Sequence, residues 1–244
     1  MSIATDALKL EVCAFGIHSC EIAQRAGAAR VELCDNPTDG GTTPSYGCIR
    51  QARELLSIDL YPIIRPRSMN YWYDEQEWAM VLHDVRMCKE LGCDGISVGI
   101  SLQDGRIDVE RMKRLVELAY PMGVTSNRVI DAAPDVFEAL EDLIAAGCER
   151  VLTSGQASSA PEGVAVLAQL VAQAADRIIV MPGAGVRASN IVALRAATGA
   201  TEFHSSARLL APNLVTSTNH KVLDAGTYWV ADEAELRAMV QALQ

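Results

Sequence analysis

Residues 8–34 read LKLEVCAFGIHSCEIAQRAGAARVELC. This stretch predicts a β-strand over 8–13, a helix over 18–27 and a second strand over 29–34, which together make one strand–helix–strand unit. Each strand carries a glutamate and a cysteine two positions apart, in LEVC (10–13) and in VELC (31–34). Because side chains at positions i and i+2 of a strand lie on the same face of a sheet, we expect each strand to present a carboxylate beside a thiol.

The alternation of strand and helix continues along the rest of the chain. Further strands are predicted over 60–67, 95–100, 123–130, 150–155, 177–183 and 202–207. Further helices are predicted over 45–56, 75–91, 108–119, 135–146, 161–174, 189–198 and 232–242. Eight such units in 244 residues predict an α/β fold of the (β/α)8 or TIM-barrel type. A doubly wound open sheet is the structural alternative, but it rarely needs eight consecutive units.

One stretch interrupts this rhythm between the last predicted strand and the last helix. Residues 209–231 contain a polar run and Gly226, and we expect them to form a long final strand-to-helix loop. Such loops lie on the C-terminal face of a barrel, where active sites are built. No linker or low-complexity segment divides the chain, so residues 1–244 are interpreted as a single domain.

The amino-acid composition restricts the classes of partner that the protein is expected to bind. The chain has 21 Lys plus Arg against 31 Asp plus Glu, which disfavours nucleic acid because phosphate backbones are bound by basic patches. No apolar stretch of about 18 residues could span a bilayer, and no signal-peptide pattern precedes the first strand. Seven sparsely spaced cysteines suit a reducing compartment. We therefore expect a cytoplasmic protein without nucleic-acid or membrane partners, and leave a homodimer or higher homo-oligomer open.

The alternation within the strands predicts a charged barrel interior. Leu10, Val12, Val31 and Leu33 should face the helices, which turns the polar set inward. The predicted interior set comprises Glu11, Cys13, Glu32, Cys34, Arg65, Arg67, Arg128, His204 and Arg208. A self-neutralising ion-pair network, with Arg65 as the countercharge of Glu32, would account for some of these residues. A ligand site accounts better for so many charges at strand ends, because burying charge without a role is costly.

Six motifs occur together in one order: LEVC (10–13), GGTTPSYG (40–47), IIRPR (63–67), RVLTSGQ (150–156), PGAGVRASN (182–190) and EFHSSAR (202–208). In order and spacing they resemble the CutC copper homeostasis protein family, over roughly residues 8–208. The resemblance implies a (β/α)8 barrel and copper handling, with Cys13 and Cys34 as Cu(I) ligands. Two stretches depart from the family: TSNRVID (125–131) stands where TFHRAFD is usual, and SMNYWYD (68–74) stands where the family is glycine-rich.

Copper binding has a physical basis in the two thiols. Cu(I) is a soft ion that prefers thiolates. Adjacent parallel strands lie about 4.8 Å apart, so the sulfurs of Cys13 and Cys34 should approach within roughly 4–5 Å. Glu11 and Glu32 are hard ligands that suit Cu(I) poorly, and a free cysteine is often only a small buried apolar residue. Copper is thus the one cofactor expected, and no organic cofactor is predicted.

The alternative function is an isomerase, lyase or hydrolase acting on a small anionic, sugar-like metabolite. The glycines of PGAGVRASN precede a predicted helix, whose N-terminus attracts anions, although they also suit a tight turn. Glu32 or His204 would act as general base, and Asp131 would orient a neighbouring group. The residues assigned to ligand binding are Glu11, Arg65, Arg67, Arg128, Ser154, Gly183, Gly185 and Arg208.

Overall fold

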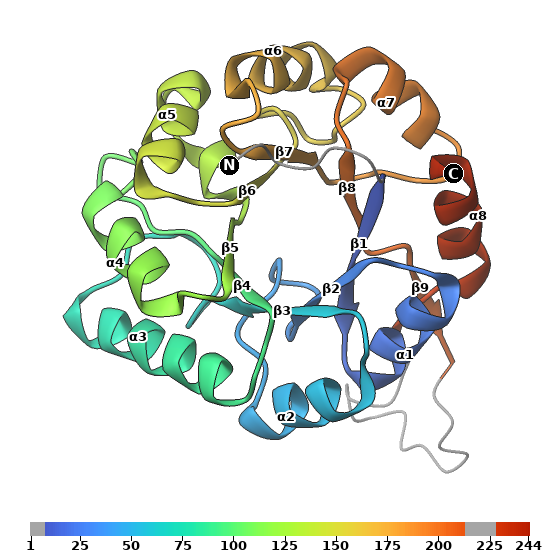
Figure 1. Cartoon of the computed structure of the whole chain (residues 1–244), viewed down its shortest axis with the longest axis horizontal. Helices are drawn as coiled ribbons and strands as arrows, with labels where there is room; N and C mark the ends of the chain where they lie inside the picture. The colour runs from blue at the N-terminus through green and yellow to red at the C-terminus, as the bar shows by residue number, and fades with distance from the viewer. Residues whose placement is uncertain (1–7, 213–227) are drawn as a thin grey trace, which may run out of the picture.

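The computed structural model describes residues 8–212 and 228–244, which form a ring of strands surrounded by helices (Figure 1). The barrel strands are β1 (Lys9–Phe15), β2 (Arg30–Cys34), β3 (Asp59–Ile64), β4 (Gly95–Val98), β5 (Gly123–Ser126), β6 (Arg150–Thr153), β7 (Ile179–Pro182) and β8 (Glu202–Ser205). The helices are α1 (Ile17–Ala26), α2 (Tyr46–Leu55), α3 (Glu75–Glu90), α4 (Val109–Ala119), α5 (Val136–Ala146), α6 (Val164–Ala174), α7 (Ile191–Thr198) and α8 (Glu233–Leu243). None of these described helices is long and apolar enough to cross a membrane.

The strands are ordered β7-β6-β5-β4-β3-β2-β1-β8, and every hydrogen-bonded pair is parallel. β7 and β8 lie in contact across the remaining gap, which nearly closes the barrel. The predicted (β/α)8 fold is therefore confirmed. In this order β1 lies between β2 and β8, with Cys13 opposite Glu32 and Glu11 opposite His204.

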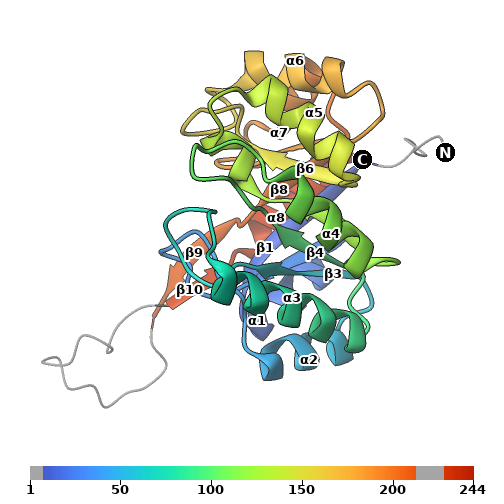
Figure 2. The ribbon, with the colours of Figure 1, turned by 90° about the vertical axis from the view of Figure 1, so that its left-hand side faces the viewer.

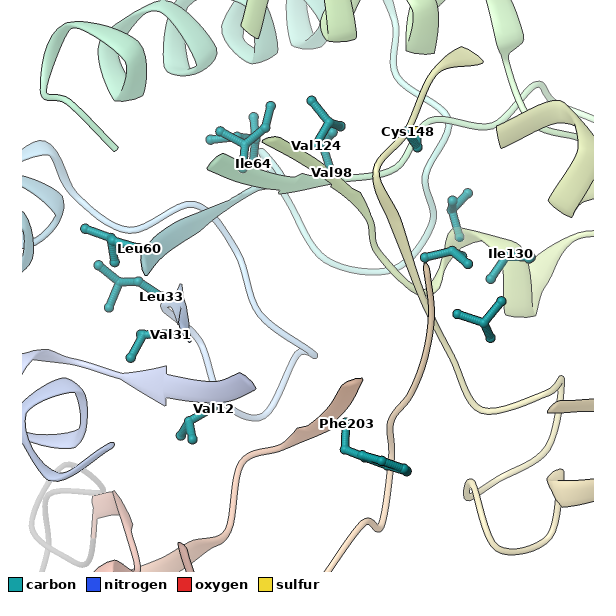
Figure 3. Packing of buried hydrophobic residues seen from close by; sticks show 14 of the residues in the cluster. Val12, Val31, Leu33, Leu60, Ile64, Val98, Val124, Ile130, Cys148 and Phe203 are labelled. Carbon is teal, nitrogen blue, oxygen red and sulfur yellow. The ribbon is translucent and has the colours of Figure 1, made fainter. Parts of the chain in front are cut away.

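The apolar residues of the strands pack outward against the helices. Leu10, Val12, Val31 and Leu33 are each at most 2% exposed and belong to the continuous hydrophobic core. Figure 3 shows Val12, Val31 and Leu33 in this layer together with Phe203 from β8. Burying one such side chain contributes about 1.5–3 kcal/mol. Because the strand period is two, this outer layer leaves the intervening polar residues facing the barrel axis.

Two predicted strands end three or more residues earlier than expected. β5 stops at Ser126 rather than at residue 130, because the Asn127 side chain accepts a hydrogen bond from the Val129 backbone N–H (3.1 Å) and caps the short 3-10 helix η1 (Arg128–Ala132). β3 stops at Ile64 rather than at residue 67. The backbone of Arg65 bonds Thr43 instead of a neighbouring strand, and Pro66 has no N–H to donate.

The expected final loop, 209–231, has strands at both ends. β9 (Arg208–Ala211) and β10 (Tyr228–Ala231) pair antiparallel and project beside the barrel (Figure 2). Residues 213–227 lie outside the described part of the chain.

Ion pairs fill the barrel interior near the N-terminal ends of its strands. Arg30 binds Glu11 through Nε and Glu202 through Nη2, the latter at 2.6 Å. Arg150 binds the same Glu202 oxygen from the other side, also at 2.6 Å. The ring of Tyr61 lies 5.0 Å from the Arg30 guanidinium carbon and 5.7 Å from that of Arg150.

Two glycines make this interior layer possible. A Cβ on Gly95 or Gly123 would clash with the Tyr61 ring or hydroxyl. Arg30, Arg150 and Glu202 were absent from the predicted interior, although Arg30 has the same parity as Glu32 in β2 and Glu202 the same parity as His204 in β8. The ion-pair network of Glu11, Arg30, Arg150 and Glu202 joins four strands and is buried. Its charges are therefore paired only when the barrel is closed, and the closed barrel requires that they be paired.

We expect Arg30→Met to lower the free energy of unfolding by about 3–5 kcal/mol, because Glu11 would keep a buried charge without its main partner. Chemical denaturation of the wild type and the variant measures this loss. Arg177→Met is the matched control, since Arg177 pairs with Glu141 on the surface with both side chains about half exposed, and it should change stability far less. Equal losses in the two variants would contradict a structural role for the buried network.

Candidate functional site

A cavity of about 590 Å³ opens at the C-terminal ends of the barrel strands. Its floor is formed by Cys13 of β1, Glu32 of β2 and His204 of β8. One wall is formed by residues that follow β3 and β5, among them Arg65 and Arg128. This face is where barrel enzymes and binding proteins place their ligands, since loops there can vary without disturbing the core.

Four polar side chains meet at the floor. The sulfurs of Cys13 and Cys34 lie 3.6 Å apart, and the Cys34 sulfur lies 3.5 Å from Glu32 Oε2. His204 Nε2 lies 3.7 Å from the same glutamate oxygen. One ligand atom each from Cys13, Glu32 and His204 falls within 4.8 Å of the others, a spacing that could hold a metal ion.

The two sulfurs are closer than the 4–5 Å expected from strand spacing. Cys34 is the register partner of Phe15 rather than of Cys13. The two thiols therefore approach diagonally across neighbouring strands, within reach of a hydrogen bond between them.

The two thiols differ in their electrostatic surroundings. The hydrogen bond with Cys34 lowers the pKa of Cys13, with burial opposing and the His204 hydrogen bond reinforcing that change. Burial raises the pKa of Cys34 well above its ordinary value, and the hydrogen bond with Cys13 adds to the rise. Cys13 is thus the thiol that ionises first, and it is the one that lines the cavity.

His204 is held from below by Glu11. His204 Nδ1 lies 2.7 Å from Glu11 Oε1, while Arg30 binds the other oxygen of that carboxylate. Burial alone would lower the pKa of His204, but hydrogen bonds with Cys13 and Glu11 and the charge of Glu32 raise it well above its ordinary value. For Glu11, burial acts to raise the pKa, yet the Arg30 charge and the His204 hydrogen bond hold it well below its usual range.

The predicted charged residues of the wall are fixed by hydrogen bonds. Arg65 donates through Nη1 to the backbone oxygens of Asp39 (2.8 Å) and Gly41 (2.9 Å). Arg128 donates to Asp131 Oδ2 (2.7 Å) and Ser154 Oγ (2.7 Å). The expected pairing of Arg65 with Glu32 is absent among the described ion pairs, because the Arg65 guanidinium is directed to the loop carbonyls instead.

Asp131 serves as an anchor for the loop after β6. Its carboxylate accepts hydrogen bonds from Thr153 Oγ1 (2.6 Å), from the Ser154 and Gln156 backbone N–H groups and from Arg128. With its oxygens engaged in this way, Asp131 is suited to positioning Arg128 and Ser154 rather than to taking a proton itself. Ser154, predicted to bind ligand, lies behind this anchor and outside the cavity lining.

Arg67 lies away from the cavity. It follows the end of β3, binds Glu77 of α3 and Asn70, and lies 5.5 Å from the centre of the Tyr73 ring. Because β3 stops at Ile64, the strand alternation that predicted an inward Arg67 does not extend to this residue.

In the loops after β7 and β8, where an anion site is predicted, one of the two glycines has its N–H engaged. The Gly183 N–H is already bonded to Thr153 O (2.9 Å), and a Cβ there would clash with Leu152. Gly185 and Arg208 line the cavity. Arg208 donates to Pro37 O (2.6 Å) and lies 4.5 Å from the centre of the Trp229 ring. The following helix, α7, begins at Ile191 rather than at the expected residue 189.

Asn127 and Tyr71 line the cavity but were not among the predicted site residues. Both stand in the two stretches that depart from the family pattern, TSNRVID (125–131) and SMNYWYD (68–74). Those departures were the signal in the sequence that could have identified them.

At neutral pH we expect iodoacetamide to modify Cys13 before the other cysteines, because its pKa is lowered and it lines an open cavity. Mass spectrometry of peptides after limited reaction measures the order. Cys48 is the internal comparison, since it is also partly exposed but burial raises its pKa. Faster modification of Cys48 would contradict the electrostatic account of the floor.

We expect the stabilising contribution of His204 to depend on pH. Its pKa is raised in the folded chain, so its charge stabilises the fold fully below the ordinary value of about 6.5 and ceases to do so as the pH rises through the raised value. The difference in unfolding free energy between wild type and His204→Gln should therefore be largest in mild acid and shrink in alkali. Denaturation at a series of pH values measures it, and a difference independent of pH would refute the assignment.

Comparison with known proteins places the chain in a family. The profile of the CutC family matches residues 8–209. A CutC family protein of Chromobacterium violaceum is 54% identical over 199 residues, covering 82% of this chain and 81% of that protein. Another from Xanthomonas campestris pv. campestris is 48% identical over 236 residues, covering 96% and 98%. The crystal structure of a provisionally assigned copper homeostasis protein CutC from Streptococcus agalactiae is 31% identical with a TM-score of 0.78, covering 82% of this chain and 98% of that one. The chain belongs to the CutC family.

Proposed function

We propose that this protein binds Cu(I) through Cys13 and Cys34, with His204 as a third donor, and serves copper homeostasis. The approach of the two sulfurs to 3.6 Å carries the proposal. Thiolates are the ligands that Cu(I) prefers, and few other donors are needed once two are present. The copper homeostasis function named for the Streptococcus agalactiae structure agrees with this chemistry.

The arrangement around the thiols favours a defined site over a chance contact. Both cysteines lie on neighbouring barrel strands, whose backbones are fixed by the parallel ladder. His204 Nδ1 is engaged by Glu11, which leaves Nε2 as the nitrogen on the side of Glu32 and Cys13. A metal-binding histidine in proteins typically has its second ring nitrogen held by a carboxylate in this way.

Glu32 has a different part in the proposed site. A carboxylate is a hard ligand for Cu(I), but Glu32 Oε2 lies 3.5 Å from the Cys34 sulfur, which can donate its proton to it. Since the pKa values of Cys34 and His204 are both raised well above their ordinary values, metal binding must displace a proton from the thiol and one from the imidazole. Glu32 is placed to receive the thiol proton.

The close approach of Cys13 and Cys34, 3.6 Å between sulfurs, suits a protein that acts in a reducing, cytoplasmic setting. Thiols this close would be oxidised easily in an oxidising compartment.

We expect the wild type to bind one Cu(I) per chain and the Cys13→Ser, Cys34→Ser double variant to lose this binding, because serine is nearly isosteric but a poor ligand for a soft ion. Anaerobic titration against a chromogenic Cu(I) chelator measures stoichiometry and affinity. Cys48→Ser, outside the cavity, is the matched control and should bind like the wild type. Equal uptake by the double variant and the wild type would exclude these thiols. Repeating the titration with Zn²⁺ tests selectivity, since a Cys, His and Glu set also suits zinc.

A further inference from the structure

The cavity is much larger than a metal ion requires. Its volume of about 590 Å³ falls within the range of roughly 300–1,000 Å³ typical of sites for small organic molecules. The floor contains Cys13, Glu32 and His204. The wall formed by Arg65, Asn127 and Arg128, with Tyr71 beside them, lines the same cavity and takes no part in the proposed copper site.

Arg65 is buried yet has unused donors. It is 5% exposed, and only Nη1 bonds the backbone oxygens of Asp39 and Gly41. Arg65 Nε is buried without a hydrogen-bond partner among the described residues. Nη2 likewise has no hydrogen bond to the described part of the chain. The loop carbonyls fix the position of the Arg65 guanidinium, and the Tyr71 ring lies 5.1 Å from its central carbon. The remaining N–H donors of Arg65 are therefore available to an acceptor.

Asn127 provides a second, independent donor on this wall. It is 3% exposed, and its Oδ1 is committed to capping η1 through the Val129 N–H. The cap determines which way the amide is turned and leaves Nδ2 buried without a partner among the described residues. The side chain fits only because residue 99 is glycine, since a Cβ there would clash with Asn127 Oδ1. Buried donors left unpaired are costly and rare, which indicates that a ligand supplies the acceptor.

Arg128 adds a second guanidinium group to the same side of the cavity. Its Nε and Nη2 are bound to Asp131 and Ser154, and its side chain is 40% exposed. Burial raises the pKa of Tyr71, and the charges of Arg65 and then Arg128 both oppose that rise. Asp131 pairs with Arg128 and offsets its charge, so Arg65 supplies the net positive charge of this wall.

We propose that this cavity binds a small organic molecule through a carboxylate or phosphate group held by Arg65, Asn127 and Arg128. An oxyanion supplies several acceptor lone pairs and matches the guanidinium fork. The rest of such a molecule extends over the floor, toward Cys13 and His204. This site differs from the predicted one at the β7 and β8 loops, because the donors come from the ends of β3 and β5.

The test uses the metal-free, reduced protein with two probes, succinate and inorganic phosphate, in isothermal titration calorimetry. Asn127→Asp keeps the oxygen that caps η1 but replaces the unpaired donor with a second, charged oxygen. We expect it to weaken binding by about tenfold or more, the loss of a hydrogen bond to a charged group. Gln76→Glu on the exposed start of α3 adds the same charge away from the cavity and should bind like the wild type.

The outcomes separate the ligand classes and the two proposals. Binding of succinate alone identifies a carboxylate site, and binding of phosphate alone identifies a phosphate site. If the wild type binds neither probe, or if Asn127→Asp binds the probe as tightly as the wild type does, the proposal is overturned. Thermal melting of Asn127→Asp shows whether it is folded, and Arg65→Lys, which keeps the charge but not the fork, provides a second variant expected to lose affinity. Cu(I) uptake by Asn127→Asp, measured in parallel, should equal that of the wild type, so failure of the copper site and of the oxyanion site remain distinguishable.

Discussion

The interior of this barrel depends on one buried carboxylate, that of Glu11. One of its oxygens binds Arg30 in the ion-pair network near the N-terminal ends of the strands, and the other binds His204 at the floor of the cavity. A carboxylate that is 1% exposed is tolerated only when its charge is compensated on both sides. Its lowered pKa follows from that compensation. Glu11 therefore links the residues that close the barrel to those that shape the site above it.

The hydrogen bond with Glu11 determines which ring nitrogen of His204 faces the cavity. Because Nδ1 is committed to Glu11, the other ring nitrogen lies between Glu32 and Cys13. The position of the imidazole is fixed by β8 pairing with β1 rather than by a mobile loop. A site built on paired strands holds its groups more exactly in place than one built on loops, so the spacing of the thiols and the imidazole is a property of the fold itself.

The period of two in the strands allowed much of the fold and the floor to be predicted. It placed Glu11, Cys13 and Glu32 inward because the alternate positions are uniformly apolar. The same alternation in RVELC and EFHSSAR also turns Arg30 and Glu202 inward. The buried ion-pair network of these residues could therefore have been predicted from the sequence, although it was not. Arg30 and Glu202 stand at the N-terminal ends of their strands, whereas the predicted interior set was drawn mainly from the C-terminal ends, where barrel sites are usual.

Other features could not be predicted from alternation. The run GVTSNRVI has the β-branched composition of a strand, yet the Asn127 side chain ends it by capping η1. Arg67 turns toward α3 because its strand has already ended. In both places a side-chain hydrogen bond, which depends on three-dimensional neighbours, outweighed the local pattern. The wall of the cavity is built from these irregular strand ends, which explains why its donors were harder to predict than the floor.

The division between floor and wall gives the cavity an electrostatic polarity. The floor carries Glu32 and two thiols, which attract a cation, and the wall carries Arg65 and Arg128, which attract an anion. A bound metal and a bound oxyanion in one cavity of this size would attract each other, more strongly than in water because the walls are largely buried. Linkage then requires each ligand to raise the affinity for the other by the same factor. The two proposed ligands could therefore occupy one cavity together. The metal would bind at β1, β2 and β8, and the oxyanion would bind at the ends of β3 and β5, so each ligand meets groups of the opposite charge.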